Sequence, residues 1–299
     1  MSHAVSVSHG AFGRATLYRL DRPIINHAHR EGHLVFCIGG ADGSMTVADA
    51  KVPATALTAC AINPWEPHSW DGADIDPGAE VMSLTLYIKP MWFLENSESA
   101  EFALKFGRPD IAITPFIGNL IKRLTAHMLE DEDNKGFDDL LFALTRECFE
   151  QSWARAPVSN LNPAFQRSSD FRVRRSLRLM QDRMTDDLDI EGIARAVGLS
   201  RPHFFKLFKQ QMGVTPNIYL NTLRAEQAIE DLLTTDKTVT DIAHDLGFSS
   251  QASFTRFFSS NVGIAPSEYR RVANCSPAAF PMIGHPERLS GMPVGAVSI

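Results

Sequence analysis

Apolar positions in the last third of the chain follow helical spacing, and the same arrangement occurs twice. The first unit has Ile193, Ala194, Gly198, Leu199, Phe204, Leu207, Phe208, Gly213, Pro216 and Tyr219, and the second has Ile242, Ala243, Gly247, Phe248, Phe254, Phe257, Phe258, Gly263, Pro266 and Tyr269. In each unit a short apolar helix is stopped by a glycine, Gly198 or Gly247, which suits the left-handed position after a helix. The pattern predicts two helix-turn-helix units in tandem.

Capping residues support these boundaries. Asp189 and Thr238 can cap the first helices of the two units, and Ser200 and Ser249 can cap the second helices. Thr215–Pro216 can open a longer helix that leads into the second unit. A stiff helix between the units would fix their separation, so that the two second helices could enter successive major grooves about 34 Å apart.

Polar positions between the apolar ones predict a DNA-binding surface. The second helices of the two units expose donors and small side chains that suit base edges and phosphates. The candidate DNA-binding residues are Arg201, Pro202, Phe205, Lys206, Lys209, Ser250, Gln251, Thr255 and Arg256.

With these motifs, residues 170–271 resemble the DNA-binding domain of the AraC/XylS family of transcription regulators. The resemblance includes Gly-Val-Thr-Pro at 213–216, Leu223-Arg224-Ala225, and the run Ile264 to Arg270. It implies seven helices, base contacts from Lys206 and Arg256, and a regulator that is more often an activator acting on RNA polymerase. The chain departs from the family at Phe258-Ser259-Ser260, where lysines are usual, so fewer phosphate contacts are expected there.

The front half has a different pattern. Short β-rich segments between Leu17 and Ile88 are separated by Gly, Asp and Pro turns, which predicts a small antiparallel barrel. The expected strands cover Leu34–Ile38, Ser44–Val47, Leu57–Ile62 and Val81–Ile88. His27-Ala28-His29 and the later Pro64-x-x-Pro67-His68 make this part similar to the cupin-type sensor domain of many AraC/XylS proteins. The predicted fold is therefore α+β, with a cupin-like barrel, following helices, and an all-α tandem helix-turn-helix domain.

The histidines of this half have two interpretations. His27 and His29, two apart on a strand, could converge with His33 and His68 on one metal ion, since imidazole suits Zn, Cu, Fe or Ni. Alternatively they hydrogen-bond strand ends or line a pocket for the polar group of a small molecule. Metal-binding cupins have a glutamate where this chain has His33, so the second interpretation is preferred and no metal or other cofactor is assigned. The candidate effector-binding residues are His27, His29, His33, Trp65 and His68.

Two helices are expected after the barrel. Thr114–Pro115 opens one with Phe116, Ile117, Leu120, Ile121, Leu124 and Met128 on one face, and Gly136 precedes another with Phe137, Leu141, Leu144, Cys148 and Phe149. Such stripes either pack on their own domain or, as the resemblance implies, form a homodimer interface. The expected domains are 1–155 for effector sensing and dimerisation, a linker at 156–169, the DNA-binding domain at 170–275, and a poorly ordered tail at 276–299.

Charge and cysteine content restrict the class of protein. The net charge is −6, with 14 basic and 21 acidic residues in 1–169, but 14 basic and 13 acidic in 170–275. A weakly basic DNA-binding part predicts modest, salt-sensitive affinity. Cys37, Cys60, Cys148 and Cys275 are far apart and are expected to be free thiols. No signal peptide or membrane span is apparent, so we expect a cytoplasmic protein.

Three functions remain open on this sequence. The leading one is a sequence-specific transcription regulator that binds an operator and is controlled by a small-molecule effector. The second is a metal-binding cupin enzyme with an accessory helical domain, although no nucleophile motif or catalytic constellation is present. The third is an architectural DNA-binding protein, which the low positive charge disfavours.

Overall fold

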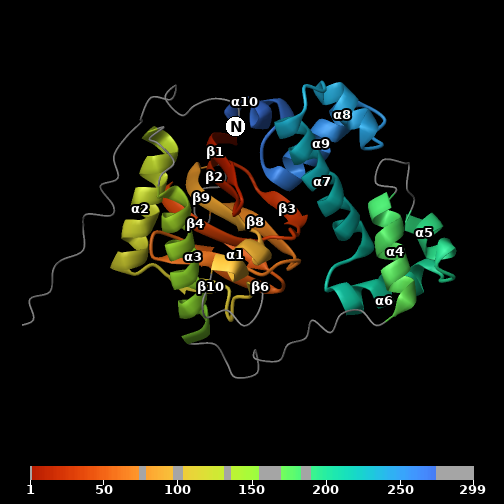
Figure 1. Ribbon diagram of the computed structural model, residues 1–299, viewed down its shortest axis with the longest axis horizontal. Helices are drawn as coiled ribbons and strands as arrows, with labels where there is room; N and C mark the ends of the chain where they lie inside the picture. The colour runs from red at the N-terminus through yellow and green to blue at the C-terminus, as the bar shows by residue number, and fades with distance from the viewer. Residues whose placement is uncertain are drawn as a thin grey trace, which may run out of the picture.

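The computed structural model describes residues 2–73, 79–96, 104–130, 136–154, 170–182 and 190–273. Figure 1 shows two β-sheets in the N-terminal half, with helices α2 and α3 on one side and the helices of the C-terminal half on the other. The expected linker 156–169, the tail 276–299, the cap Asp189 and Cys275 lie outside the described residues. This arrangement confirms the predicted α+β class with a separate helical domain.

Both sheets of the N-terminal domain are antiparallel. The larger contains, in spatial order, β1 (His3–Gly10), β2 (Gly13–Leu20), β9 (Val81–Ile88), β4 (Gly32–Gly40), β7 (Thr58–Ile62) and β10 (Asp110–Ala112). The smaller contains β3 (Ile24–His27), β8 (His68–Ala73), β5 (Gly43–Val47) and β6 (Ala50–Ala54). The order shows that strands far apart in sequence, such as β4 and β9, are neighbours.

The larger sheet is covered on both faces, and alternation along its strands decides which side chain faces which cover. On β4, Leu34 and Phe36 belong to the core formed with α2 (Pro115–Glu130) and α3 (Phe137–Ala154). Val35 and Cys37, on the opposite face, share a core with the smaller sheet. Full burial of a strand on both faces explains its nearly continuous apolar run.

Most of the predicted N-terminal elements are confirmed, with three corrections. The sheet starts at His3 rather than near Leu17, because β1 pairs with β2 along its length. The third predicted strand begins at Thr58, since Thr55 hydrogen-bonds around the preceding turn. Phe116 is 56% exposed and is not part of the buried stripe of α2. The short helix α1 (Pro90–Asn96), which buries Trp92 and Phe93, was not predicted.

Within residues 170–273 the structure describes seven helices, in agreement with the resemblance. They are α4 (Phe171–Asp182), α5 (Ile190–Ala196), α6 (Arg201–Met212), α7 (Pro216–Thr234), α8 (Val239–Asp245), α9 (Gln251–Val262) and α10 (Pro266–Ala273). Gly198 and Gly247 have φ values of 73° and 76°, so both turns use the left-handed conformation predicted for them.

The predicted caps are confirmed at two positions and wrong at two. Thr215 accepts a hydrogen bond from the amide of Ile218, and Thr238 forms a reciprocal capping box with Asp241. Ser200 occupies the cap position of α6, but its hydroxyl makes no capping hydrogen bond. Helix α9 is capped by Ser250 rather than by Ser249, because it starts one residue later than its counterpart.

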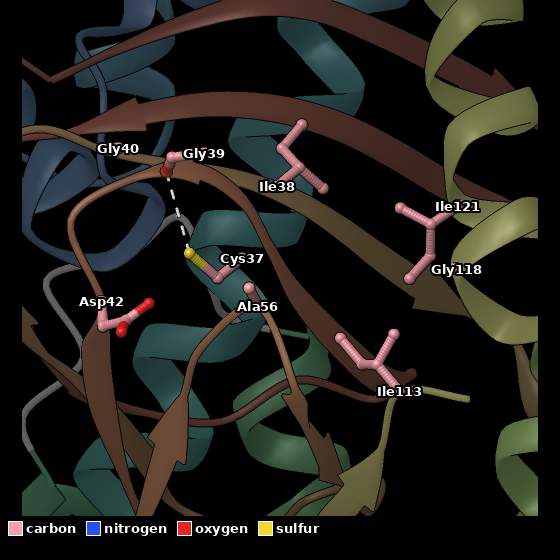
Figure 2. A pocket seen from close by; sticks show the side chains of 9 residues that line it. All are labelled: Cys37, Ile38, Gly39, Gly40, Asp42, Ala56, Ile113, Gly118 and Ile121. Atoms are coloured by element: carbon pink, nitrogen blue, oxygen red, sulfur yellow. Dashed lines mark hydrogen bonds between the residues drawn. The ribbon is translucent and has the colours of Figure 1, made fainter. Parts of the chain in front are cut away.

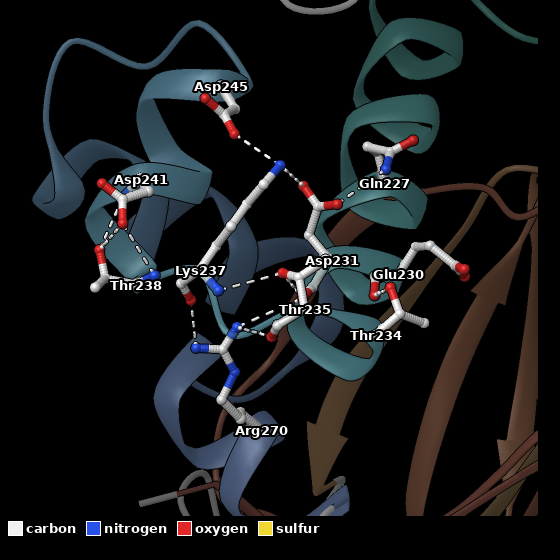
Figure 3. A network of polar contacts seen from close by, with 10 residues as sticks. All are labelled: Gln227, Glu230, Asp231, Thr234, Thr235, Lys237, Thr238, Asp241, Asp245 and Arg270. Atoms are coloured by element: carbon white, nitrogen blue, oxygen red, sulfur yellow. Dashed lines mark hydrogen bonds and ion pairs between the residues drawn. The ribbon is translucent and has the colours of Figure 1, made fainter.

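A polar network holds the end of α7 against α8 and α10 (Figure 3). The Arg270 guanidinium donates to the carbonyls of Leu232 and Lys237, at 3.1 and 2.6 Å. The Lys237 ammonium lies 3.6 Å from the Asp231 carboxylate and 2.8 Å from that of Asp245. Carbonyls at a helix C-terminus have no partner within the helix, so Arg270 supplies donors that the helix itself lacks.

The two domains are in direct contact. Helix α10 packs on β1, and α9 packs on β3. The Arg14 Nη1 group on β2 donates to the Tyr269 hydroxyl on α10 at 3.1 Å, and that hydroxyl lies 3.2 Å from His9 Nε2. Residues 255 positions apart are thus joined by a buried hydrogen bond. The contact places the helix-turn-helix domain beside the open edge of the smaller sheet.

Candidate functional site

Helix α6 presents a basic surface. Arg201, Pro202, Lys206 and Lys209 are exposed, while Phe204 and Phe208 on the other side are fully buried. The guanidinium of Arg201 lies over the ring of Phe205, 5.1 Å from its centroid. Phe205 is half-buried, so it supports the arginine rather than projecting freely.

Helix α9 presents a surface of small polar groups with one cation. Gln251 and Arg256 are exposed, and Thr255 is half-buried. The Gln251 side chain accepts a hydrogen bond from the Thr240 hydroxyl at 2.8 Å, which orients its amide. The capping hydroxyl of Ser250 is itself used by the amide of Ser253. A base contact from Ser250 would therefore compete with its capping role.

The first unit has additional positive charge that the sequence analysis missed. Helix α4, which packs on α5 and α6, exposes Arg174, Arg175 and Arg178. The buried side of the same helix carries Val173 and Met180. The run of arginines on one amphipathic segment was a visible signal, and it supplies candidate phosphate contacts beside α6.

The structure brings the four predicted histidines together at one end of the two sheets. His27 on β3 is paired with His68 on β8, and their ring centroids are 4.4 Å apart. His29 lies in the loop after β3, with its ring centroid 5.2 Å from that of His68. His33 reaches the cluster from β4 of the other sheet, and its Nδ1 is 3.2 Å from His68 Nε2.

Burial and hydrogen bonds determine the protonation and the tautomer of these histidine rings. Burial lowers the pKa of His27 to about 4 and that of His68 to about 3, and it places the pKa of His29 and His33 well below their ordinary value. All four rings are therefore neutral at pH 7. The Nδ1 groups of His27 and His68 donate to the carbonyls of Ile25 and Glu66, so both residues carry the lone pair on Nε2. His68 Nε2 then accepts from His33 Nδ1.

Beside the cluster, a row of polar side chains runs across the larger sheet. Tyr87 on β9 is paired with both His33 and Arg14. The His33 ring stacks on the Tyr87 ring, with centroids 4.4 Å apart. The guanidinium of Arg14, on β2, lies 3.7 Å from the centroid of the same Tyr87 ring. Because Arg14 also contacts Tyr269, the row leads from the histidines to α10.

Several polar atoms on these inner strand faces are buried without a partner. Among the described residues they include the Thr16 and Tyr18 hydroxyls, the Ser83 hydroxyl, and the Nε2 atoms of His29 and His33. Native proteins pair nearly all buried polar atoms, with protein, water or ligand. A cluster of unpaired ones is the arrangement expected of a site that receives a polar molecule or ion.

Trp65, which is predicted to line the effector site, lies between the histidine loop and α7. Its ring stacks on Tyr219 of α7, with centroids 4.8 Å apart and planes at 18°. Its backbone has a φ of 63°, which is rare for a bulky residue, and its amide donates to the His29 carbonyl at 2.7 Å. The strained turn thus connects the histidine loop with the DNA-binding domain. Trp70, by contrast, is buried in the core.

A small cavity lies at the other end of β4 (Figure 2). It is lined by Cys37, Ile38, Gly39, Gly40, Asp42, Ala56, Ile113, Gly118 and Ile121, and its volume is about 40 Å³. A cavity that holds benzene is about 150 Å³, so this one accepts water but no metabolite of ordinary size. Cys37, Cys60 and Cys148 are buried free thiols, as predicted.

Comparisons with known proteins agree with this geometry. Residues 193–272 match the family model described as a helix-turn-helix domain. The regulatory protein PocR of Salmonella typhimurium is 34% identical over 105 residues, which cover 35% of each chain. A solved regulator with an AraC-type DNA-binding domain from Chromobacterium violaceum is 32% identical, with 33% of this chain and 89% of that chain covered and a TM-score of 0.31. The C-terminal part of the chain is therefore a helix-turn-helix domain of the AraC type.

A third similarity extends over both domains. ToxT of Vibrio cholerae strain SCE256, solved with a bound unsaturated fatty acid, has a TM-score of 0.54, covers 89% of this chain and 98% of its own, and is 14% identical. At this identity the likeness shows a common two-domain fold. The chain spans only 35% of PocR and 11% of related HTH-type regulators of Staphylococcus aureus. PocR and the Staphylococcus aureus proteins are described as regulators.

No helix in the described part of the chain is both long enough and apolar enough to cross a membrane.

Proposed function

We propose that this protein is a sequence-specific regulator of transcription that binds double-stranded operator DNA through α6 and α9. The observation that carries the proposal is the pair of equivalent helices that expose Lys206 and Arg256 at corresponding positions. Each helix follows a glycine turn of the same conformation and is fixed by two buried phenylalanines. Rigid helices with exposed cations and amides suit insertion into major grooves.

We further propose that a small effector bound between the two sheets controls DNA binding. The unpaired hydroxyls of Thr16, Tyr18 and Ser83 and the neutral histidines would pair with its polar groups. ToxT was solved with an unsaturated fatty acid. The inner strand faces of the present chain carry hydroxyl and imidazole groups beside Arg14, which favours a smaller and more polar effector.

We further predict that the protein forms a homodimer and that its DNA-bound form contacts RNA polymerase. The apolar stripes of α2 and α3 are used within their own domain, so a homodimer would use the outer surface of α2 around the exposed Phe116. An activator would in addition contact RNA polymerase. Both remain predictions of family membership, as does the cytoplasmic location.

Selection of the full-length protein on random double-stranded DNA tests the proposed function. We expect enrichment of a sequence with two half-sites about one helical turn apart. Binding should then weaken by about 1–3 kcal/mol for each mismatched base pair in either half-site. Equal binding to selected and unrelated DNA would instead support an architectural protein and contradict the proposal.

A thermal-shift screen of small polar metabolites with the full chain tests the effector. A compound that binds the folded state raises Tm by mass action. The replacement Ser83→Ala should abolish that shift, whereas Ser249→Ala, an exposed serine before α9, should leave it unchanged. If the compound still raised the Tm of the Ser83→Ala variant, the placement of the effector would be contradicted.

A further inference from the structure

Three histidines in the cluster offer nitrogen ligands at a spacing that suits one ion. The ligand atoms of His27, His29 and His68 all lie within 4.8 Å of one another. Ligands about 2.05 Å from a tetrahedral zinc ion are about 3.3 Å apart. Each pair of ligand atoms therefore needs to approach by at most about 1.5 Å, which rotations about χ1 and χ2 can provide.

The surroundings orient these rings as metal ligands are usually oriented. His27 and His68 each donate Nδ1–H to a backbone carbonyl, at 2.6 and 2.8 Å, which directs the lone pair of Nε2 toward the cluster. His29 Nε2 is buried and has no hydrogen-bond partner among the described residues. His33 Nε2 is likewise unpaired in a side chain that is 4% exposed. Neutral, desolvated imidazoles are the donor set that Zn, Cu, Fe and Ni prefer, and an ion would replace the hydrogen bond that His68 Nε2 accepts from His33.

The same histidines belong to a segment that is attached to α7. The carbonyl of Ala28, between His27 and His29, accepts a hydrogen bond from the Thr222 hydroxyl of α7 at 2.9 Å. Arg30 Nε lies 2.7 Å from the Glu226 carboxylate one turn further along α7. Trp65, bonded to the His29 carbonyl, stacks on Tyr219. Helix α7 connects the two helix-turn-helix units. A displacement of the segment around Ala28 would therefore shift α7 and, with it, both units.

We infer that His27, His29 and His68 bind one first-row transition-metal ion, and that the ion, by fixing the segment around Ala28, controls the position of α7 and hence DNA binding. The inference rests on the proposed function and names a ligand for the histidine end of its site. The missing carboxylate of cupin metal sites does not oppose it, because three imidazoles form a complete protein ligand set for zinc.

The first experiment measures metal binding alone. Full-length protein without a histidine tag is treated with chelator, dialysed and titrated with ZnSO₄ by calorimetry, and its zinc content is measured after gel filtration. We expect about one equivalent of zinc, with loss of binding in His27→Ala and in His68→Ala and retention in His244→Ala, an exposed histidine of α8. Less than about a tenth of an equivalent in the wild type overturns the site.

Folding of the variants does not limit this test, because the wild-type titration is decisive by itself. A second readout replaces Zn²⁺ by Co²⁺, whose visible absorption reports nitrogen coordination. A spectrum that is identical in wild type and His68→Ala would place the ion elsewhere and overturn the assignment.

The second experiment measures coupling to DNA. The dissociation constant for the selected operator is determined with chelator and with one equivalent of Zn²⁺, and we expect a change of about fivefold or more. Thr222→Val removes the hydroxyl that bonds Ala28, so this variant should bind zinc as the wild type does but lose most of the zinc effect on DNA. Zinc binding without any effect on operator affinity, or an undiminished effect in Thr222→Val, overturns the control of DNA binding.

The two proposals fail in different ways. If no operator is selected, the proposed DNA-binding function is wrong while metal binding can still be measured. If an operator is selected and bound equally in zinc and in chelator, only the further inference fails.

Discussion

The Thr222 hydroxyl on α7 donates to the backbone carbonyl of Ala28, the residue that separates His27 from His29, at 2.9 Å. It also lies 2.9 Å from the Ile218 carbonyl one turn back in its own helix. One side chain thus joins helix α7 of the C-terminal domain to the histidine loop of the N-terminal domain. The bond is buried, so its loss leaves a carbonyl unpaired rather than solvated.

Glu226 should make the stability of the domain contact depend on pH. Burial raises the pKa of this carboxyl to about 7, and Arg30 only partly opposes the shift. The folded state then holds a proton that the unfolded chain, with an ordinary glutamate pKa near 4.5, has released. The free energy of unfolding should therefore fall as the pH rises from about 4.5 to 7. Urea unfolding across this range measures the slope.

Glu226→Gln provides the matched comparison, since it keeps the shape of the side chain without the titration. We expect it to flatten the slope, while Glu230→Gln, an exposed glutamate on the same helix, leaves the slope unchanged. An unaltered slope in Glu226→Gln would show that another group is responsible.

Tyr269→Phe should weaken the contact between α10 and the sheets. The Tyr269 hydroxyl accepts from Arg14 and lies against His9, whose pKa is lowered to about 4 by burial, so the hydroxyl donates to a neutral ring. Its removal leaves the buried Arg14 guanidinium without this acceptor and takes a donor from His9, at a cost of about 1–3 kcal/mol. Thermal unfolding measures the loss.

Tyr219→Phe is the control for this replacement, because the Tyr219 hydroxyl has only a 3.4 Å contact with Gln181. It should cost less than Tyr269→Phe. Equal losses for the two tyrosines would mean that the Arg14 hydrogen bond contributes nothing specific.

Lys206 and Lys209 lie on the same exposed surface of α6 and allow a comparison of base reading with phosphate contact. Lys206→Ala should lower affinity for the selected operator by about 1–3 kcal/mol and relax its base preference, as should Arg256→Ala on α9. Lys209→Ala and Arg201→Ala should weaken binding to all sequences alike and reduce the salt slope by about one.

Competition with unrelated DNA at several salt concentrations distinguishes these outcomes, and Arg146→Ala on α3 serves as a control for loss of charge alone. If Lys206→Ala lowered operator and unrelated binding equally, Lys206 would be a phosphate contact. If Lys209→Ala altered the preferred operator sequence, Lys209 would contact bases rather than phosphates.

Arg270→Ala should destabilise the second helix-turn-helix unit. The guanidinium donates to the carbonyl of Leu232 in the last turn of α7. It also donates to the carbonyl of Lys237 in the following loop (Figure 3), and its loss leaves both carbonyls without these donors. Measured by urea unfolding, the cost should be about 1–3 kcal/mol. Arg271→Ala, next to it but exposed, should cost under about 0.5 kcal/mol. Similar losses at the two positions would contradict the capping role.

Local patterns along the chain were sufficient to predict the helical domain. Gly198 and Gly247 end their helices because only a residue without a side chain adopts the left-handed conformation readily. Thr215 and Thr238 cap helices by contacts with residues three positions later. Interactions within a few residues are encoded in spacing, so the repeat, the helix order and the exposed cations of α6 could be deduced without coordinates.

Tertiary structure decided how the histidines and the domain contact are built. The pairing of His27 with His68 depends on the register of β3 against β8, and His33 joins them only because the larger sheet lies opposite the smaller one. A turn with a positive φ at Trp65 stacks its ring on Tyr219 of α7, a contact that the sequence did not indicate. Register between strands and packing between domains depend on the summed burial of many distant side chains, and no short stretch of sequence records that sum.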